Sequence, residues 1–192
     1  MSSAVRHNLA VCAHPRRDSF NQALLAAATE ALVARGETVE VSDLYAESFE
    51  AAMSADELAR DHRPTPEVLR EQARVARADR LLFFYPIWWF DRPAILKGWC
   101  DRVLRPGFAY RVDSSGTPRG LLGLKSAALV VTLGATEDQC SVAEVTDSMV
   151  HGTLGFCGLT AVRTRPLFGV PGAEDADRRS MIADTAEWVT QA

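Results

Sequence analysis

Short apolar runs alternate with amphipathic segments along most of the chain. The runs are rich in Val, Leu, Ala and Phe and predict β-strands over 8–13, 38–43, 80–85, 126–133 and 159–165. Apolar residues at helical spacing predict helices over 19–35, 66–78, 93–104, 141–155 and 173–190. This alternation is typical of repeated β-α-β units, so the chain is predicted to be an α/β protein built on a parallel sheet.

Five strands fit a flavodoxin-like, doubly wound parallel sheet with helices on both faces. Two segments interrupt the alternation: 45–65 is polar and acidic, and 105–123 is rich in Gly and Pro. Both are predicted to be long surface loops. A chain of 192 residues is long enough for one well-buried core and short for two, so residues 1–192 are expected to form a single domain.

Composition excludes several classes of function. The contents of 47% hydrophobic and 24% charged residues are ordinary for a globular protein. A formal net charge of -4 without a long basic run argues against a nucleic-acid partner. The polar segment 1–7 leads straight into a strand, so no signal peptide and no membrane span are expected, and a cytoplasmic location is predicted. No metal site is expected, and the widely spaced thiols are predicted to be buried and reduced: Cys12, Cys100, Cys140 and Cys157.

The third predicted strand is followed by three adjacent aromatic residues, Trp88, Trp89 and Phe90. A plain connection would use Gly, Asn or Ser at this point, and Pro93 then suits the first position of a helix. The aromatics should therefore lie at the carboxyl end of a buried parallel strand, where open α/β sheets bind ligands. They predict a wall for a flat apolar ligand; the alternative is that they only plug the end of the core.

The loop after the first predicted strand leads into a helix N-terminus. Ser19, with Gln22 three residues later, is typical of a capping box, so the unpaired N–H groups of the first turn should face this loop. These groups and the positive end of the helix dipole form a natural anion site, to which His14, Ser19 and Asn21 add side-chain donors. A phosphate group is the predicted ligand, although many capped helix starts bind no anion.

The fourth predicted strand ends in mostly small residues, Thr132, Leu133, Gly134 and Ala135, which let a backbone approach a ligand closely. In a flavodoxin-like order the first, third and fourth strands are neighbours, so their carboxyl ends surround one crevice. A planar aromatic molecule that carries a phosphate satisfies all three loops, and a flavin nucleotide is the commonest such molecule. Viewed alone, Gly134 could equally be an ordinary turn glycine.

Taken in order, these motifs resemble a known family. The matching segments are 14–15, 19–21, 42–45, 86–90, 93–99, 101–103, 108–110 and 156–158. Their order and content resemble the NAD(P)H:quinone oxidoreductases of the flavodoxin-like superfamily. The resemblance implies a homodimeric flavoenzyme that takes hydride from NADH or NADPH and passes two electrons, by a ping-pong route, to a quinone or a similar flat aromatic acceptor.

The resemblance also implies which residues hold the cofactor. Those around the flavin phosphate are His14, Ser19, Phe20 and Asn21. Those that line the isoalloxazine, largely through their backbone, are Pro86, Ile87, Trp88, Trp89 and Phe90. Those that complete its pyrimidine side are Thr132, Leu133, Gly134 and Ala135. Because the flavin carries the redox chemistry, no acid–base side chain is strictly required, and the catalytic residues stay unassigned.

Departures from the family leave three questions open. After the fourth strand the chain reads Gly134-Ala135-Thr136, where larger members have a Gly-Gly pair and then a Tyr and a His, so those acceptor-side groups are missing or replaced. His151 could be recruited instead, but a helix-face histidine is more often structural or solvated. The chain also lacks the carboxyl-terminal extension that helps hold adenosine in longer relatives, which favours FMN over the alternative, FAD.

Two other functions remain open. A flavin-binding electron carrier, or a regulatory or ancillary subunit, would show only incidental diaphorase activity. Such carriers usually have a strongly acidic docking face, and -4 over 192 residues is mild. The second of these functions keeps the fold without the flavin: a nucleotide- or phosphate-binding protein in which the aromatics are a structural plug.

Overall fold

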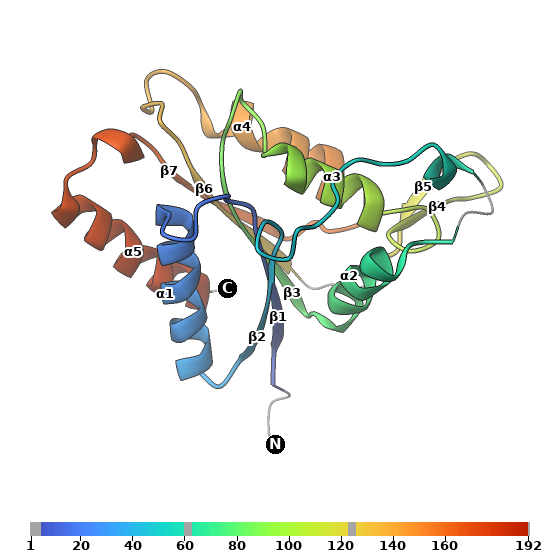
Figure 1. Cartoon of the computed structure of the whole chain (residues 1–192), viewed down its shortest axis with the longest axis horizontal. Helices are drawn as coiled ribbons and strands as arrows, with labels where there is room; N and C mark the ends of the chain where they lie inside the picture. The colour runs from blue at the N-terminus through green and yellow to red at the C-terminus, as the bar shows by residue number, and fades with distance from the viewer. Residues whose placement is uncertain (1–4, 60–62, 123–125, 192) are drawn as a thin grey trace.

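A five-stranded parallel sheet forms the centre of the part of the chain that the structure describes, residues 5–59, 63–122 and 126–191 of a computed structural model (Figure 1). Its order is β2-β1-β3-β6-β7, and all neighbouring strands are parallel. The strands are β1 (His7–Cys12), β2 (Thr38–Asp43), β3 (Arg80–Pro86), β6 (Ser126–Thr132) and β7 (Val162–Leu167). The order reverses direction between β1 and β3, which confirms the predicted doubly wound fold and opens a crevice at the carboxyl ends of those strands.

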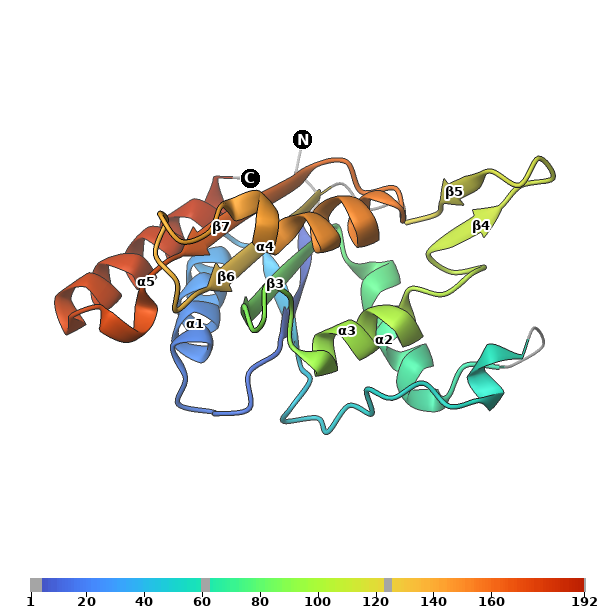
Figure 2. The same cartoon turned by 90° about the horizontal axis from the view of Figure 1, so that it is seen from above.

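Helices cover both faces of the sheet, as Figure 2 shows from above. On one face lie α1 (Phe20–Ala34) and α5 (Asp175–Thr190). On the other lie α2 (Pro66–Arg77), α3 (Ala94–Val103) and α4 (Val142–Met149). α4 continues as the π-helical segment η2 (Val150–Gly155), so the helix predicted over 141–155 changes type midway. Among the described residues, no helix is long and apolar enough to cross a membrane.

The sequence of the central strand β3 explains why helices cover both faces of the sheet. All seven of its residues are buried, as expected for a parallel strand between two layers of helices. Because side chains alternate along a strand, Leu81, Phe83 and Tyr85 join the core under α2, α3 and α4, whereas Leu82 and Phe84 join the core under α1 and α5. The continuous apolar run in the sequence therefore serves two cores.

The two segments predicted as loops contain more structure than expected. Residues 105–123 include an antiparallel hairpin of β4 (Tyr110–Val112) and β5 (Pro118–Gly120); the predicted last residue, Gly123, lies outside the described residues. Segment 45–65, of which 60–62 are likewise outside, contains the 3-10 turn η1 (Asp56–Leu58). It is not purely a surface loop, because Phe49 and Glu57 are buried. The last strand begins at Val162 rather than at residue 159; a second 3-10 turn, η3 (Val170–Gly172), follows it.

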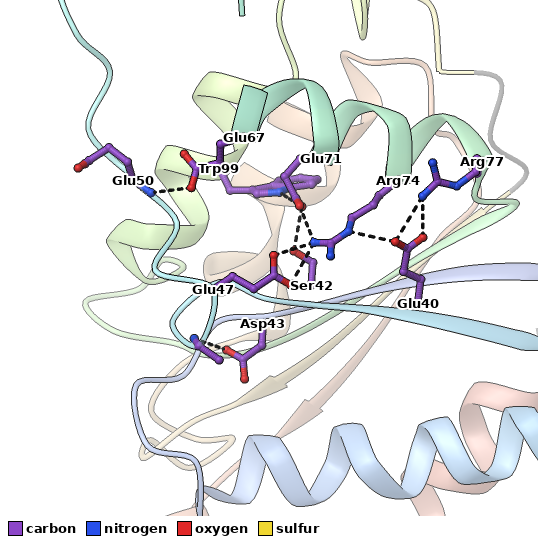
Figure 3. Close-up of polar contacts among 11 residues, drawn as sticks. Glu40, Ser42, Asp43, Glu47, Glu50, Glu67, Glu71, Arg74, Arg77 and Trp99 are labelled. Atoms are coloured by element: carbon purple, nitrogen blue, oxygen red, sulfur yellow. Dashed lines mark hydrogen bonds and ion pairs between the residues drawn. The ribbon is translucent and has the colours of Figure 1, made fainter. Parts of the chain in front are cut away.

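A buried carboxylate joins α2 to the sheet and to α3 (Figure 3). Glu71 Oε2 accepts hydrogen bonds from Ser42 Oγ at 2.8 Å and from Trp99 Nε1 at 2.9 Å. Its Oε1 accepts one from Arg74 Nη1 at 2.6 Å, and Arg74 is also paired with Glu47. A buried charge is tolerated only when it is paired and hydrogen-bonded in this way. The network fixes α3, the helix that follows the aromatic segment.

Candidate functional site

The loops that follow β1, β3 and β6 meet at one edge of the sheet. The rings of His14 and Trp88 lie 6.2 Å apart, centroid to centroid. Asn21 Nδ2 donates a hydrogen bond to Thr132 Oγ1 at 2.9 Å, and Ile87 N–H donates one to Thr132 O at 2.8 Å. The three segments singled out from the sequence therefore surround one place.

The N-terminus of α1 forms an anion cradle. Ser19 is the N-cap, and its Oγ accepts a hydrogen bond from Gln22 N–H at 3.3 Å. Only this half of the predicted capping box forms, because the Gln22 side chain donates to Asp43 Oδ2 at 2.6 Å instead. The N–H groups of Phe20 and Asn21 have no acceptor within the described residues. Two free N–H groups at the positive end of a helix suit a phosphate.

His14 and Asn21 take different places around this cradle. His14 is half-buried, and its Nδ1 lies 3.1 Å from Arg16 N and 3.3 Å from Arg16 O, so it accepts from the N–H or donates to the carbonyl according to its tautomer. Burial lowers the pKa of His14 below its ordinary value, so the neutral ring is favoured. Asn21 is buried, and its side chain is engaged with Thr132. Its backbone N–H has no acceptor among the described residues and is free to meet an anion.

The aromatic segment is a tight turn in an unusual conformation. Trp88 N–H donates to Asp91 O at 2.9 Å, and Asp91 N–H donates to Trp88 O at 3.2 Å. The two residues between them, Trp89 and Phe90, have positive φ angles of 51° and 62°. This pattern matches a type I′ turn, whose central positions normally take Asn and Gly. Left-handed backbone costs a bulky residue about 1–3 kcal/mol, and such strain concentrates at functional sites.

The same turn presents its side chains to solvent. Trp89 is 97% exposed, Phe90 59% and Trp88 43%. The alternative in which these aromatics plug the end of the core is therefore wrong. Large aromatic side chains left in water at the carboxyl edge of an α/β sheet indicate a binding surface.

A cavity of about 180 Å³ lies between this turn and the loop after β6. It is lined by Ile87, Trp89, Phe90, Leu133, Gly134, Ala135, Cys140 and Val145. The N–H groups of Trp89, Phe90, Gly134 and Ala135 find no acceptor in the part of the chain that the structure describes. Four free donors around an apolar slot can meet the oxygen and nitrogen atoms at the edge of a planar heterocycle.

Gly134 is not required by the protein itself. A Cβ atom there would meet only Pro171 Cγ, at an ordinary 3.7 Å, and its φ does not lie in the left-handed region. Because Gly134 also lines the slot, we expect that its lack of a side chain serves the cavity rather than the fold.

A second cavity of about 650 Å³ adjoins the anion cradle. Its lining includes His14, Ser19 and Phe20 on one side and Arg178 and Arg179 of α5 on the other. It offers room for the part of a ligand that extends beyond a phosphate, and its lining carries both signs of charge, with Asp18 and Asp175 beside the arginines.

The remaining predicted residues lie as follows. Pro86, Thr132 and Leu133 are buried at the ends of β3 and β6. His151 is on η2, with its side chain 78% exposed and 3.8 Å from Asp147, and it lines neither cavity. All four cysteines are buried and free, as predicted. Across the described ranges, no cluster of three or more metal-ligating side chains is present.

The family model described as "Flavodoxin-like fold" matches residues 6–189, so the chain belongs to this family. The predicted fold and the predicted superfamily are thereby confirmed. The names of curated relatives are more specific than the family model. The chain is 34% identical over 194 residues to NAD(P)H dehydrogenase (quinone) 1 of Cavia porcellus, covering 88% of this chain and 70% of that protein. It is 35% identical over 201 residues to ribosyldihydronicotinamide dehydrogenase (quinone) of Homo sapiens, covering 91% and 87%.

Solved structures agree with these relatives. The NAD(P)H:quinone oxidoreductase from Methanothermobacter marburgensis superimposes with a TM-score of 0.86 at 32% identity, covering 97% of this chain and 98% of that one. A putative quinone reductase from Klebsiella pneumoniae gives a TM-score of 0.84 at 28% identity, covering 95% and 83%. The chain is thus similar, over nearly its whole length, to proteins named as quinone reductases.

Proposed function

We propose that this chain is a flavin-dependent oxidoreductase that takes hydride from NADH or NADPH and passes two electrons to a quinone or a similar flat acceptor. One observation carries the proposal: an anion cradle and an apolar slot ringed by free N–H groups lie side by side at the carboxyl edge of the sheet. The names of the relatives, which are quinone reductases, support it.

The residues present fit a flavin. Its phosphate would lie on the N–H groups of Phe20 and Asn21, with His14 beside it. Its ring would lie in the 180 Å³ slot, against the turn and the Gly134 loop. When bound, the flavin supplies the hydride-accepting and hydride-donating chemistry. The free N–H groups of the slot would stabilise negative charge on the ring edge, as an oxyanion hole does for an oxygen.

The small size of the slot has a consequence for turnover. Enclosed ligand pockets usually measure roughly 300–1,000 Å³, so a slot of about 180 Å³ covers only part of a ring system. An uncovered face leaves room for nicotinamide and acceptor to stack one after the other at reacting distance. Trp89 and Phe90, which are exposed and line the slot, would lie beside the ring.

Within this function we propose FMN as the cofactor, with FAD as the alternative. The 650 Å³ cavity beyond the cradle, with Arg178 and Arg179 in its lining, would accommodate a second phosphate and a nucleoside. FAD is therefore retained as the alternative cofactor. Extraction of the flavin followed by mass spectrometry distinguishes the two. A mass corresponding to FMN, without the adenylate of FAD, supports our choice, and the mass of FAD contradicts it.

We also propose a homodimer and a cytoplasmic location. Besides the turn, another aromatic side chain is exposed: Phe156 is 42% exposed and packs edge to face on the partly buried Tyr110, with 4.8 Å between the ring centroids. A cavity of about 360 Å³ lies between Arg92 and this pair. Apolar surface of this kind marks an interface, and a second copy would cover the slot from the solvent side. Light scattering of the purified protein tests the stoichiometry; a monomer at micromolar concentration contradicts it.

The purified protein tests the function directly. We expect a yellow protein whose visible absorption is bleached by NADH or NADPH without oxygen and restored by menadione, with many turnovers in steady state. The alternative, an electron carrier or ancillary subunit, predicts a yellow protein that oxidises NAD(P)H no faster with menadione than without an acceptor. A colourless protein that binds no added flavin contradicts both.

A further inference from the structure

The strained turn lacks the support that its own side chains would normally give. Trp89 and Phe90 have left-handed backbone, yet they are 97% and 59% exposed and so have little packing to hold them. Residues in such conformations persist only where their surroundings fix them. Within one chain, the next residues in the sequence supply a restraint.

Arg92 is 7% exposed and reaches from the turn to the α4–η2 segment. Its Nη1 donates to Ser148 Oγ and its Nη2 donates to Thr153 Oγ1, each at 3.2 Å. Asp91 Oδ1 accepts hydrogen bonds from Arg92 N–H at 2.7 Å and from Ser148 Oγ at 3.1 Å. Asp91, Arg92 and Ser148 thus form a closed ring of hydrogen bonds that includes the last residue of the turn. Charge-assisted bonds of this kind are the stronger class.

The other end of this contact is also an unusual element. Thr153 lies in the π-helical segment η2, and its Oγ1 donates to Ser148 O at 2.9 Å across the widened turn. π-helical turns are rare and occur often at functional sites. Just before it, α4 contributes Val145 to the slot, whose other wall contains Trp89 and Phe90. Arg92 therefore connects two walls of one cavity without lining it.

We propose that Arg92 is a positioning residue: through Asp91, Ser148 and Thr153 it locks the Trp88–Asp91 turn in its left-handed form and sets the width of the slot in which a flat acceptor stacks. The stacking part rests on the proposed function, and the locking part does not. A shift of a wall by about 1 Å can slow an aligned transfer roughly a hundredfold, so a residue that never touches the ring can control its rate.

The locking part is tested on the flavin-free protein by hydrogen exchange. Arg92→Met keeps the length of the side chain and removes its donors; Ser148→Ala removes one exposed hydroxyl and should fold in any case. In both variants the amides of Trp88 and Asp91 should exchange at least about tenfold faster, with Arg92→Lys in between. Arg70→Met, an exposed change on α2, is the matched control and should leave both amides unchanged. Wild-type exchange in Arg92→Met and Ser148→Ala overturns the proposal.

The stacking part is tested with chemically reduced enzyme mixed with menadione or with ferricyanide, which takes single electrons and need not stack. In Arg92→Met and Ser148→Ala, the ratio of the menadione rate to the ferricyanide rate should fall about tenfold or more, and it should stay constant in Arg70→Met. An unchanged ratio with fast amide exchange overturns the stacking part alone. If wild-type protein reduces no quinone, the proposed function fails, and the exchange experiment still decides the role of Arg92.

Discussion

The buried pair of Arg102 and Glu57 should govern the stability of the segment that lies beside α3. Both side chains are nearly inaccessible, 4% and 3% exposed, and Arg102 Nε lies 2.9 Å from Glu57 Oε1. Arg102 also donates to Glu50 O and to Glu67 Oε2, and its guanidinium lies 5.5 Å from the centre of the Phe49 ring. One side chain on α3 thus contacts segment 45–65 at Phe49, Glu50 and Glu57.

Arg102→Met should leave the Glu57 carboxylate buried without its ion-pair partner on α3. Removal of one member of a buried ion pair costs about 3–5 kcal/mol. Arg105 Nη1 remains 3.7 Å from Glu57 Oε1 and compensates in part, so we expect the lower end, about 3 kcal/mol, at neutral pH. The double variant Arg102→Met/Glu57→Gln removes the stranded charge as well. It should be more stable than Arg102→Met alone.

The pH dependence of this loss has a definite sign. Burial opposes ionisation of Glu57, but hydrogen bonds from Ser54 N–H and Arg102 outweigh it and lower its pKa below the ordinary 4.5. A carboxyl group with a lowered pKa stabilises the fold above its ordinary pKa, and the contribution is lost as pH falls through the folded value. In Arg102→Met, protonation relieves the stranded acid as pH falls towards about 4.5, and the wild type loses the contribution of Glu57 below that pH, so the gap between the two should narrow steadily on acidification.

Urea unfolding at a series of pH values measures both effects. A loss below about 1 kcal/mol at neutral pH, the size of an exposed pair, would refute the argument. So would a gap that stays constant as the solution is acidified.

Two further predictions concern packing and the thiols. Gly98→Ala should lower the free energy of unfolding by about 1–2 kcal/mol despite the helix propensity gained, because the new Cβ would lie 2.2 Å from Ala51 O; a more stable variant in urea would contradict this contact. Burial raises the pKa of Cys12 and Cys100 to about 12 and that of Cys157 to about 11. A thiol reagent at about pH 8 should therefore leave these three unmodified in folded protein and label all four cysteines in denaturant, and rapid labelling of two or more in the folded state would count against it.

The parts of the fold that follow from periodicity were predictable from the sequence. β3 is recognisable because its residues 81–85, which are covered on both faces of the sheet, are all apolar, and the strand order then places the three loops together. The hairpin of β4 and β5 was missed because its strands are three residues long and mostly exposed, so no apolar alternation distinguishes them from a loop. The π-helical η2 was missed because its residues continue a helical pattern and differ only in hydrogen bonding.

The candidate site was predictable in place but not in conformation. Its position depends on topology, which the pattern of strands and helices conveys. The left-handed turn was not predictable, because Trp89 and Phe90 are residue types that sequence rules exclude from such positions. The Arg92 contacts were missed because Ser148 and Thr153 lie more than 50 residues away, and no local spacing indicates their meeting. Likewise, the predicted capping box is incomplete because folding brings Asp43 close to Gln22, whose side chain donates its hydrogen bond to that carboxylate.

The central claim is that the slot beside Gly134 holds a flavin ring, and a flavin titration of Gly134→Val tests it most directly. The nearest atom to the new side chain's Cβ is Pro171 Cγ at 3.7 Å, so the variant should fold normally. A branched side chain in the slot should weaken flavin binding by about 10- to 100-fold, whereas Gly172→Val, where a Cβ meets nothing within 4 Å, should bind as wild type does. Gly134→Val that folds and binds flavin with wild-type affinity would contradict the account.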